Sequence, residues 1–91
     1  MKYVVFGKEE QGEIVHQVPV AFPNHMTHCL VAEAMLKSEE LLGYKVISAG
    51  EFSSSGLWIK CHGKSDTLKV ESRGEQDSTL FSTNDYLHGF V

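Results

Sequence analysis

Residues 2–22, KYVVFGKEEQGEIVHQVPVAF, carry the pattern that decides the fold. The segment from Lys2 to Lys8 is rich in the β-branched and aromatic residues that favour strands. Residues 9–12, EEQG, form a polar stretch that ends in glycine, which is typical of a turn, and residues 13–18 again alternate between two faces. We therefore expect an N-terminal β-hairpin. Because Pro19 has no amide proton, it should end the pairing or lie on a sheet edge.

A helix is predicted next, over residues 25–42, with Asn24 as its N-cap and Gly43 as its C-cap. At 3.6 residues per turn, six apolar residues share one face of this helix: Leu30, Val31, Ala34, Met35, Leu41 and Leu42. Residues 44–52 and 57–62 are predicted strands around the turn sequence SSSG, so we expect a second hairpin.

The last third of the chain holds weaker signals. Residues 66–70 are expected to add a short edge strand. Ser72 and Glu75 have the spacing of a capping box, which predicts a second helix that runs to His88. The order β-β-α-β-β-(β)-α predicts a two-layer α+β domain, with a mainly antiparallel sheet of four to five strands and both helices on one face.

Length and composition limit the classes of protein to consider. The chain has 91 residues, which is enough for one domain, 1–91. It contains no apolar run of the length that spans a bilayer, and its N-terminal apolar stretch is too short for a signal peptide, so we expect a cytoplasmic protein. Its net charge of −4 argues against broad non-specific binding to nucleic acids.

The segment 61–65, CHGKS, contains the end of a phosphate-binding loop motif. That motif needs a second glycine at position 58, where this chain has Trp58, and a helix after the loop, where this chain looks extended. The sequence therefore predicts no nucleotide binding here. Gly63 is expected to supply a turn at the end of a strand.

Histidine and cysteine raise the question of a metal site. His25, His28 and Cys29 lie near the start of the predicted helix, and Cys61 and His62 lie at a strand end. Zinc takes about four such ligands, but adjacent strand residues point to opposite faces, so Cys61 and His62 should not share an ion. We expect no metal and no cofactor.

Two alternatives to that expectation remain. A zinc-binding module would use His25, His28, Cys29 and Cys61. A nucleophilic enzyme would combine Cys29 or Cys61 with His28 and Asp77, but no catalytic motif supports this combination, and an enzyme is less favoured than a binding protein.

The strand at 57–62 predicts a binding face. If Leu57, Ile59 and Cys61 point to the core, the other face carries Trp58, Lys60, His62 and, beyond the strand, Lys64. The lysines decide between the two faces, because burying unpaired ammonium groups costs more free energy than exposing one indole. The charged segment 64–77 is expected to present Arg73 beside this face.

Three interpretations of this face remain open. The favoured one is the contact surface for a protein partner, since tryptophan is enriched at binding hot spots. Tryptophan beside basic residues can also stack on bases and contact phosphates, so a nucleic-acid-binding module is an alternative. In the third, the face is simply solvated and the lysine stems cover the indole.

Several short stretches within residues 22–77 resemble small uncharacterised proteins encoded by phages and prophages. They are Phe22-Pro23, Thr27-His28, Val31-Ala32, the segment 46–50, and CHGKS with Leu68 and Ser72-Arg73 after it. The resemblance implies an accessory protein of a mobile element that acts in a bacterial cytoplasm by binding a host or phage protein. It implies no activity, cofactor or catalytic residue.

Overall fold

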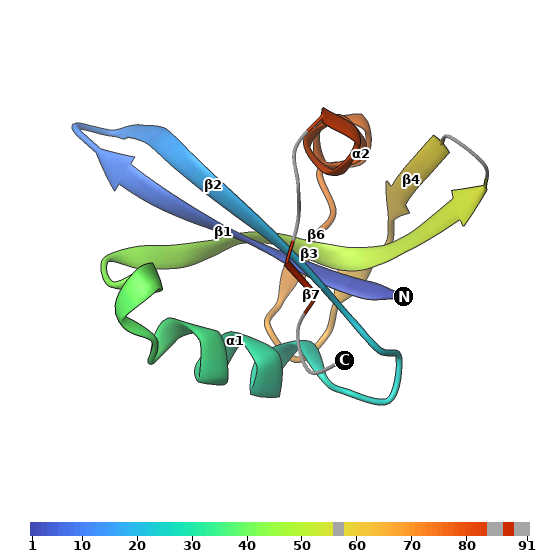
Figure 1. Cartoon of the computed structure of the whole chain (residues 1–91), viewed down its shortest axis with the longest axis horizontal. Helices are drawn as coiled ribbons and strands as arrows, with labels where there is room; N and C mark the ends of the chain where they lie inside the picture. The colour runs from blue at the N-terminus through green and yellow to red at the C-terminus, as the bar shows by residue number, and fades with distance from the viewer. Residues whose placement is uncertain (56–57, 84–86, 89–91) are drawn as a thin grey trace.

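The computed structural model describes residues 1–55, 58–83 and 87–88, and of Ser55, Trp58, Leu87 and His88 only the backbone. Along the chain, β-strands precede and follow each of the two helices, α1 and α2 (Figure 1). The elements are β1 (Lys2–Glu10), β2 (Glu13–Phe22), α1 (His28–Leu36), the 3-10 turn η1 (Glu39–Leu41), β3 (Tyr44–Ser55), β4 (Trp58–His62), β5 (Lys64–Ser65), β6 (Val70–Glu71), α2 (Glu75–Thr83) and β7 (Leu87–His88).

The main sheet has the strand order β4-β3-β1-β2-β7. Both predicted hairpins, β1–β2 and β3–β4, are present, and β1 and β3 also pair antiparallel, whereas β7 pairs parallel with β2. The α+β class and the order of the elements are thus confirmed. Pro19 does not end the pairing, because it lies opposite Val5 within β2. On the other side of β2, β7 pairs with Val20 and Ala21. The residue that this register would place beside Pro19 lies outside the described residues, so the edge position of Pro19 stays a prediction.

The two helices lie on opposite faces of the sheet, not on one face as predicted (Figure 1). The reason is in β1, where Tyr3 and Val5 point to one face, Val4 and Phe6 to the other, and all four are fully buried. An apolar run on both faces of a strand needs cover on both sides. Helix α1 covers Val4 and Phe6, and α2 covers Tyr3 and Val5 through Phe81.

Helix α1 is shorter than predicted, 28–36 rather than 25–42. Its N-cap is Thr27, whose side chain accepts from the Leu30 amide, and not Asn24. The helix stops because the Ser38 hydroxyl donates to the Met35 carbonyl, in competition with the backbone ladder. The 3-10 turn η1 follows, and then Gly43 with a positive φ.

The buried stripe of α1 also differs from the prediction. Val31 is buried and Met35 packs against the core, as expected, but Leu30 is 57% exposed and Leu42 is 79% exposed. The buried residues of the helix are His28, Val31 and Ala32. The prediction for Leu42 was wrong because it extended one helical period across the break at Ser38, where the chain turns. Leu30 lies before that break, and nothing in the break explains its exposure.

Two predictions for the last third of the chain are also wrong. Residues 66–69 are not an edge strand but the turn between β5 and β6. Helix α2 ends at Thr83, and the predicted helical residue His88 lies in β7. In the predicted capping box, Ser72 accepts from the Gly74 amide, not from that of Glu75. Among the described residues, no helix is long and apolar enough to cross a membrane.

Candidate functional site

The two faces of β4 divide as the alternation predicts. Cys61 is buried beneath α2 and Ile59 packs against the same core, whereas Lys60 and His62 are exposed. The side chain of Trp58, and the whole of Leu57, lie outside the described residues. The exposed basic positions of the predicted binding face are therefore confirmed for Lys60 and His62, while the exposure of Trp58 stays a prediction.

The partner strand extends this exposed surface. Lys60 pairs with Ser53 of β3 and His62 pairs with Glu51, so these four side chains share one face of the hairpin, opposite to the face of Ile59 and Cys61. A shallow hollow of about 360 Å³ lies here, lined by Met1, Asn24, Glu51, Phe52, Ser53, Ser54 and His62. We call Glu51, Ser53, Lys60 and His62 the hairpin face. Helix α1 packs against β1 and β3.

Lys64 is separated from the hairpin face by a turn. Gly63 has φ +82°, a left-handed conformation that favours glycine, and it redirects the chain into β5 as predicted. The Lys64 ammonium lies 3.7 Å from Asp66 and lines a second hollow, of about 250 Å³, together with Lys2 and His28. Lys64 thus lies next to the predicted binding face, but the turn at Gly63 removes it from the alternating side chains of β4.

Arg73 does not lie at the hairpin face but contacts Asp77 and Gln17. Its guanidinium Nε donates to Asp77 Oδ1 at 2.7 Å, and its second nitrogen donates to Gln17 at 2.7 Å. Both partners lie on the side of the sheet that α2 covers, whereas Lys60 and His62 point to the other side. The structure therefore does not join Arg73 to the predicted binding residues.

The CHGKS segment comprises the end of β4, a turn at Gly63 and strand β5, and does not form a phosphate-binding loop. Ser65 is buried, and its hydroxyl accepts from the amide of Leu68 and so is already engaged within the chain. Lys64 and Ser65 form a strand, followed by a turn where the motif needs a helix.

The alternative zinc ligands are distributed over both faces of the sheet. His28 is buried against Phe22 on the α1 side, with its Nε2 at 2.8 Å from the Gly50 carbonyl. Cys61 is buried on the α2 side, and Cys29 Sγ lies 3.7 Å from Glu33. His25 is exposed in the loop before the helix. Within the described part of the chain, no three His, Cys, Asp or Glu side chains come together as metal ligands.

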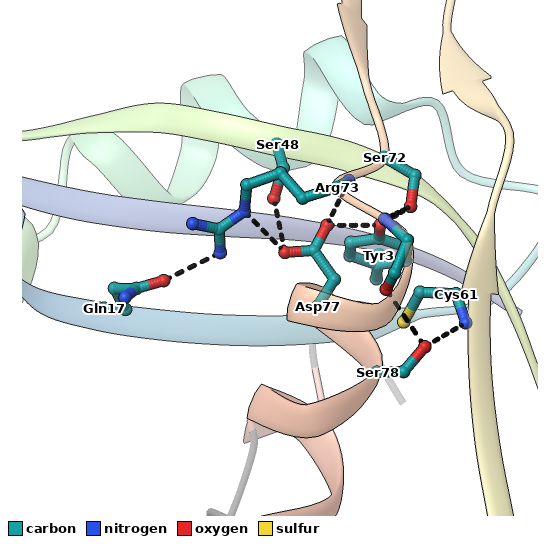
Figure 2. A network of polar contacts seen from close by, with 9 residues as sticks. Tyr3, Gln17, Ser48, Cys61, Ser72, Arg73, Asp77 and Ser78 are labelled. Carbon is teal, nitrogen blue, oxygen red and sulfur yellow. Dashed lines mark hydrogen bonds and ion pairs between the residues drawn. The ribbon is translucent and has the colours of Figure 1, made fainter.

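The densest polar cluster surrounds Asp77, which is fully buried at the start of α2. Figure 2 shows its carboxylate pointing from the helix toward Tyr3 and Ser48. Asp77 Oδ1 accepts from Arg73 Nε and from the Ser48 hydroxyl at 3.1 Å, and Oδ2 accepts from the Arg73 amide at 2.9 Å. The Tyr3 hydroxyl lies 2.6 Å from Oδ2 and 2.6 Å from Ser72 Oγ.

The proton positions in this cluster follow from donor counts. An ionised carboxylate can only accept, so the single phenol proton of Tyr3 goes to Asp77, and Ser72 donates to the phenol oxygen. Burial, together with the hydrogen bond to Asp77, raises the pKa of Tyr3 far above its ordinary value, so the phenol stays neutral. Every oxygen of Asp77 is engaged, which makes the cluster a fixed anchor for α2.

Cys61 lies beside this anchor. Its amide donates to the Ser78 hydroxyl at 2.8 Å, and the same hydroxyl donates to the Gly74 carbonyl at 3.0 Å. Burial raises the pKa of the Cys61 thiol to about 11. A thiol with such a pKa is almost wholly protonated at neutral pH and is a poor nucleophile.

The combination of Cys61, His28 and Asp77 considered for nucleophilic catalysis does not assemble. Asp77 belongs to α2 and Cys61 lies beneath this helix, while His28 lies across the sheet and is hydrogen-bonded to the Gly50 carbonyl.

The cluster around Asp77 was not predicted from the sequence. Two sequence features are consistent with it: Tyr3 lies within an apolar run, and Arg73 precedes Asp77 by four residues at the start of a helix.

The two cysteines should differ sharply in reactivity. Cys29 is partly exposed and Cys61 is buried. At pH 8, a pKa of about 11 leaves Cys61 roughly two orders of magnitude less thiolate than an ordinary free cysteine would have. We expect a coloured disulfide reagent to react with one thiol per native chain quickly, and with both in concentrated guanidinium.

Single variants assign the fast thiol. Cys61→Ala should keep the fast phase, and Cys29→Ser should remove it. A fast reaction in native Cys29→Ser would contradict the buried position of Cys61.

No protein-family model matches the chain, and neither the curated proteins nor the solved structures contain a significant match to it.

Proposed function

We propose that this protein is a small non-enzymatic binding protein that holds a protein partner at the β3–β4 hairpin, with the hairpin face and Trp58 as the contact surface. The observation that carries the proposal is that β4, a terminal strand of the described sheet, leaves Lys60 and His62 exposed, while Cys61 is buried and Ile59 is partly buried on the other face. The resemblance to phage and prophage proteins points to a bacterial host or phage protein as the partner.

The polar clusters of the structure favour binding over catalysis. The Asp77 carboxylate is fully buried and has no spare acceptor position, so the cluster supports packing rather than proton transfer to a substrate. The zinc-binding alternative has its four ligands on different faces. For a nucleic-acid module, the hairpin face carries Lys60 and His62 but also the carboxylate of Glu51, and so offers little net positive charge.

The proposal predicts that two substitutions on β4 abolish capture of one and the same partner. The intact chain, Trp58→Ala and Lys60→Glu would be immobilised, exposed to bacterial lysate with and without phage infection, and the bound proteins quantified by mass spectrometry. A hot-spot truncation costs at least about 2 kcal/mol, so the specific partner should be depleted about thirtyfold by Trp58→Ala.

Lys37→Glu is the matched control, because Lys37 is an exposed lysine at the far end of α1 and its change alters the net charge as Lys60→Glu does. It should retain the partner, and all variants should keep the circular dichroism spectrum and melting temperature of the intact chain. If every captured protein binds the β4 variants and the intact chain equally, the hairpin is not the binding surface.

A further inference from the structure

The outer edge of β4 has a definite backbone orientation. The Phe52 amide donates to the Met1 carbonyl at 2.8 Å, and the N-terminal ammonium donates to the Phe52 carbonyl at 3.2 Å, so the backbone groups of Phe52 point away from β4. Cys61 lies opposite Phe52 in the antiparallel pair. Opposed residues orient their backbone groups alike, either toward each other or away, so those of Cys61 point outward from the sheet. Ile59, two residues earlier on β4, has the same orientation as Cys61.

Helix α2 covers only part of this edge. The outward amide of Cys61 donates to Ser78 of α2, so this position is already occupied. Beside Ile59, a groove of about 620 Å³ lies between the helix and the strand. We call this the β4–α2 groove. It is lined by Ile59, Lys60, Glu75, Ser78, Thr79, Ser82 and Thr83.

An outward-facing strand backbone beside a groove is a site for strand addition. Within the described residues, β4 ends the sheet and no strand lies beyond it. A free edge offers amide and carbonyl groups that pair with any extended chain, and side-chain contacts then provide the specificity. The groove therefore fits an extended backbone better than a compact small molecule.

The charge of Lys60 indicates which kind of extended chain the edge of β4 would bind. Lys60 is exposed, and in the described part of the structure it forms no ion pair, unlike Lys45, Lys64 and Arg73. A second copy of β4, with the sequence WIKCH, would bring no carboxylate to Lys60. An acidic side chain on the added strand would instead pair with Lys60. Its alternate residues meet Ile59 and α2, where the carboxylate of Glu75 also lines the groove, so these residues must be uncharged.

We propose that the β4–α2 groove takes an extended acidic peptide segment of the partner, which pairs with the backbone of β4 at Ile59 and places a carboxylate beside Lys60. The inference rests on the proposed function and names the chemistry of the partner: acidic residues that alternate with apolar ones.

The test uses the full chain, labelled with nitrogen-15, and the capped peptide Val-Asp-Val-Asp-Val as the probe. Its addition should shift the amide signal of Ile59 and slow the hydrogen exchange of that amide. The lysine counterpart, Val-Lys-Val-Lys-Val, should bind about 1.4- to fivefold more weakly, the range expected for one cross-strand ion pair. Lys60→Glu should reverse this preference.

Backbone methylation separates strand pairing from simple filling of the groove. A strand presents alternate amides to its neighbour, so methylating the Val amides and methylating the Asp amides should have opposite effects. One set should abolish binding and the other should leave it unchanged. Equal binding of both methylated peptides would overturn the inference, as would an Ile59 amide that is already protected from exchange in the free chain.

The two proposals fail in different ways. If the partner is captured through Trp58 and Lys60 but no peptide shifts Ile59, the strand-addition inference is wrong and the proposed function stands. The opposite result is that the acidic peptide binds at Ile59 while Trp58→Ala and Lys60→Glu capture every protein as well as the intact chain does. In that case the groove binds strands and the hairpin face is not the partner's contact surface.

Discussion

Asp77→Ala is expected to lower the free energy of unfolding by about 3–5 kcal/mol, the range for removing one partner of a buried ion pair. The loss is large because the carboxylate accepts from Tyr3, Ser48 and Arg73 at once. Without it, two buried hydroxyls and a mostly buried guanidinium lose their acceptor. A domain of this size is stable by only about 5–15 kcal/mol, so much of the variant should be unfolded at 37 °C.

Urea denaturation followed by circular dichroism measures this loss. Asp77→Asn keeps the shape and one carbonyl acceptor but loses the charge, so it should fall between the wild type and Asp77→Ala. Asp66→Ala is the matched control, since Asp66 is exposed and lies 3.7 Å from Lys64, and its cost should be below about 1 kcal/mol. Equal costs for Asp66→Ala and Asp77→Ala would show that the cluster does not anchor α2.

The elements that depend on local patterns could be predicted from the sequence. Alternation and turn residues place the β1–β2 and β3–β4 hairpins, and the alternation of lysine with apolar residues puts Ile59 and Cys61 inward and Lys60 outward. The same reasoning identifies Gly63 as a turn residue at a strand end. These features depend on residues that are close together in the sequence, and the tertiary contacts agree with them.

The features that depend on distant residues could not be predicted. The end of α1 at Leu36 depends on Ser38 bonding back to the helix, which the apolar period of residues 30–42 hides. The burial of His28 depends on the carbonyl of Gly50, which comes from β3. The Asp77 anchor combines residues from β1, β3 and the start of α2, and no spacing along the chain shows such a set.

The position of Arg73 shows the same limit for the candidate site. Its place in the chain, soon after Lys64, suggested the β4 face, but the chain crosses β3 between them and carries Arg73 to the α2 side. There Asp77 and Gln17 engage it. Residues that are near in sequence were separated because the sheet is covered on both faces, which in turn follows from the two-sided apolar run of β1.

Gly50→Ala is expected to destabilise the chain by more than about 3 kcal/mol, at or beyond the upper end of the range for overpacking a core. A methyl group at this position would lie 2.4 Å from the His62 carbonyl oxygen and 3.2 Å from the Ser72 side chain. The first neighbour is backbone at the end of β4, so it cannot rotate away as a side chain could. Gly50 thus allows the chain after β4 to cross close over β3, and its own carbonyl also bonds His28.

Gly7→Ala tests whether the neighbour at Gly50, rather than the loss of glycine in a strand, causes the effect. A methyl group at Gly7 would also be crowded, at 2.9 Å from Ile47 and 3.2 Å from Ile14, but both neighbours are side-chain methyl groups and not backbone atoms, so they can shift by a few tenths of an ångström more readily than a strand can. We expect Gly7→Ala to cost less than about 1.5 kcal/mol. Thermal denaturation of both variants gives the comparison. If Gly50→Ala melts as high as Gly7→Ala, the chain after β4 is free to move away from β3, and the path that separates Arg73 from the hairpin face is not fixed by this contact.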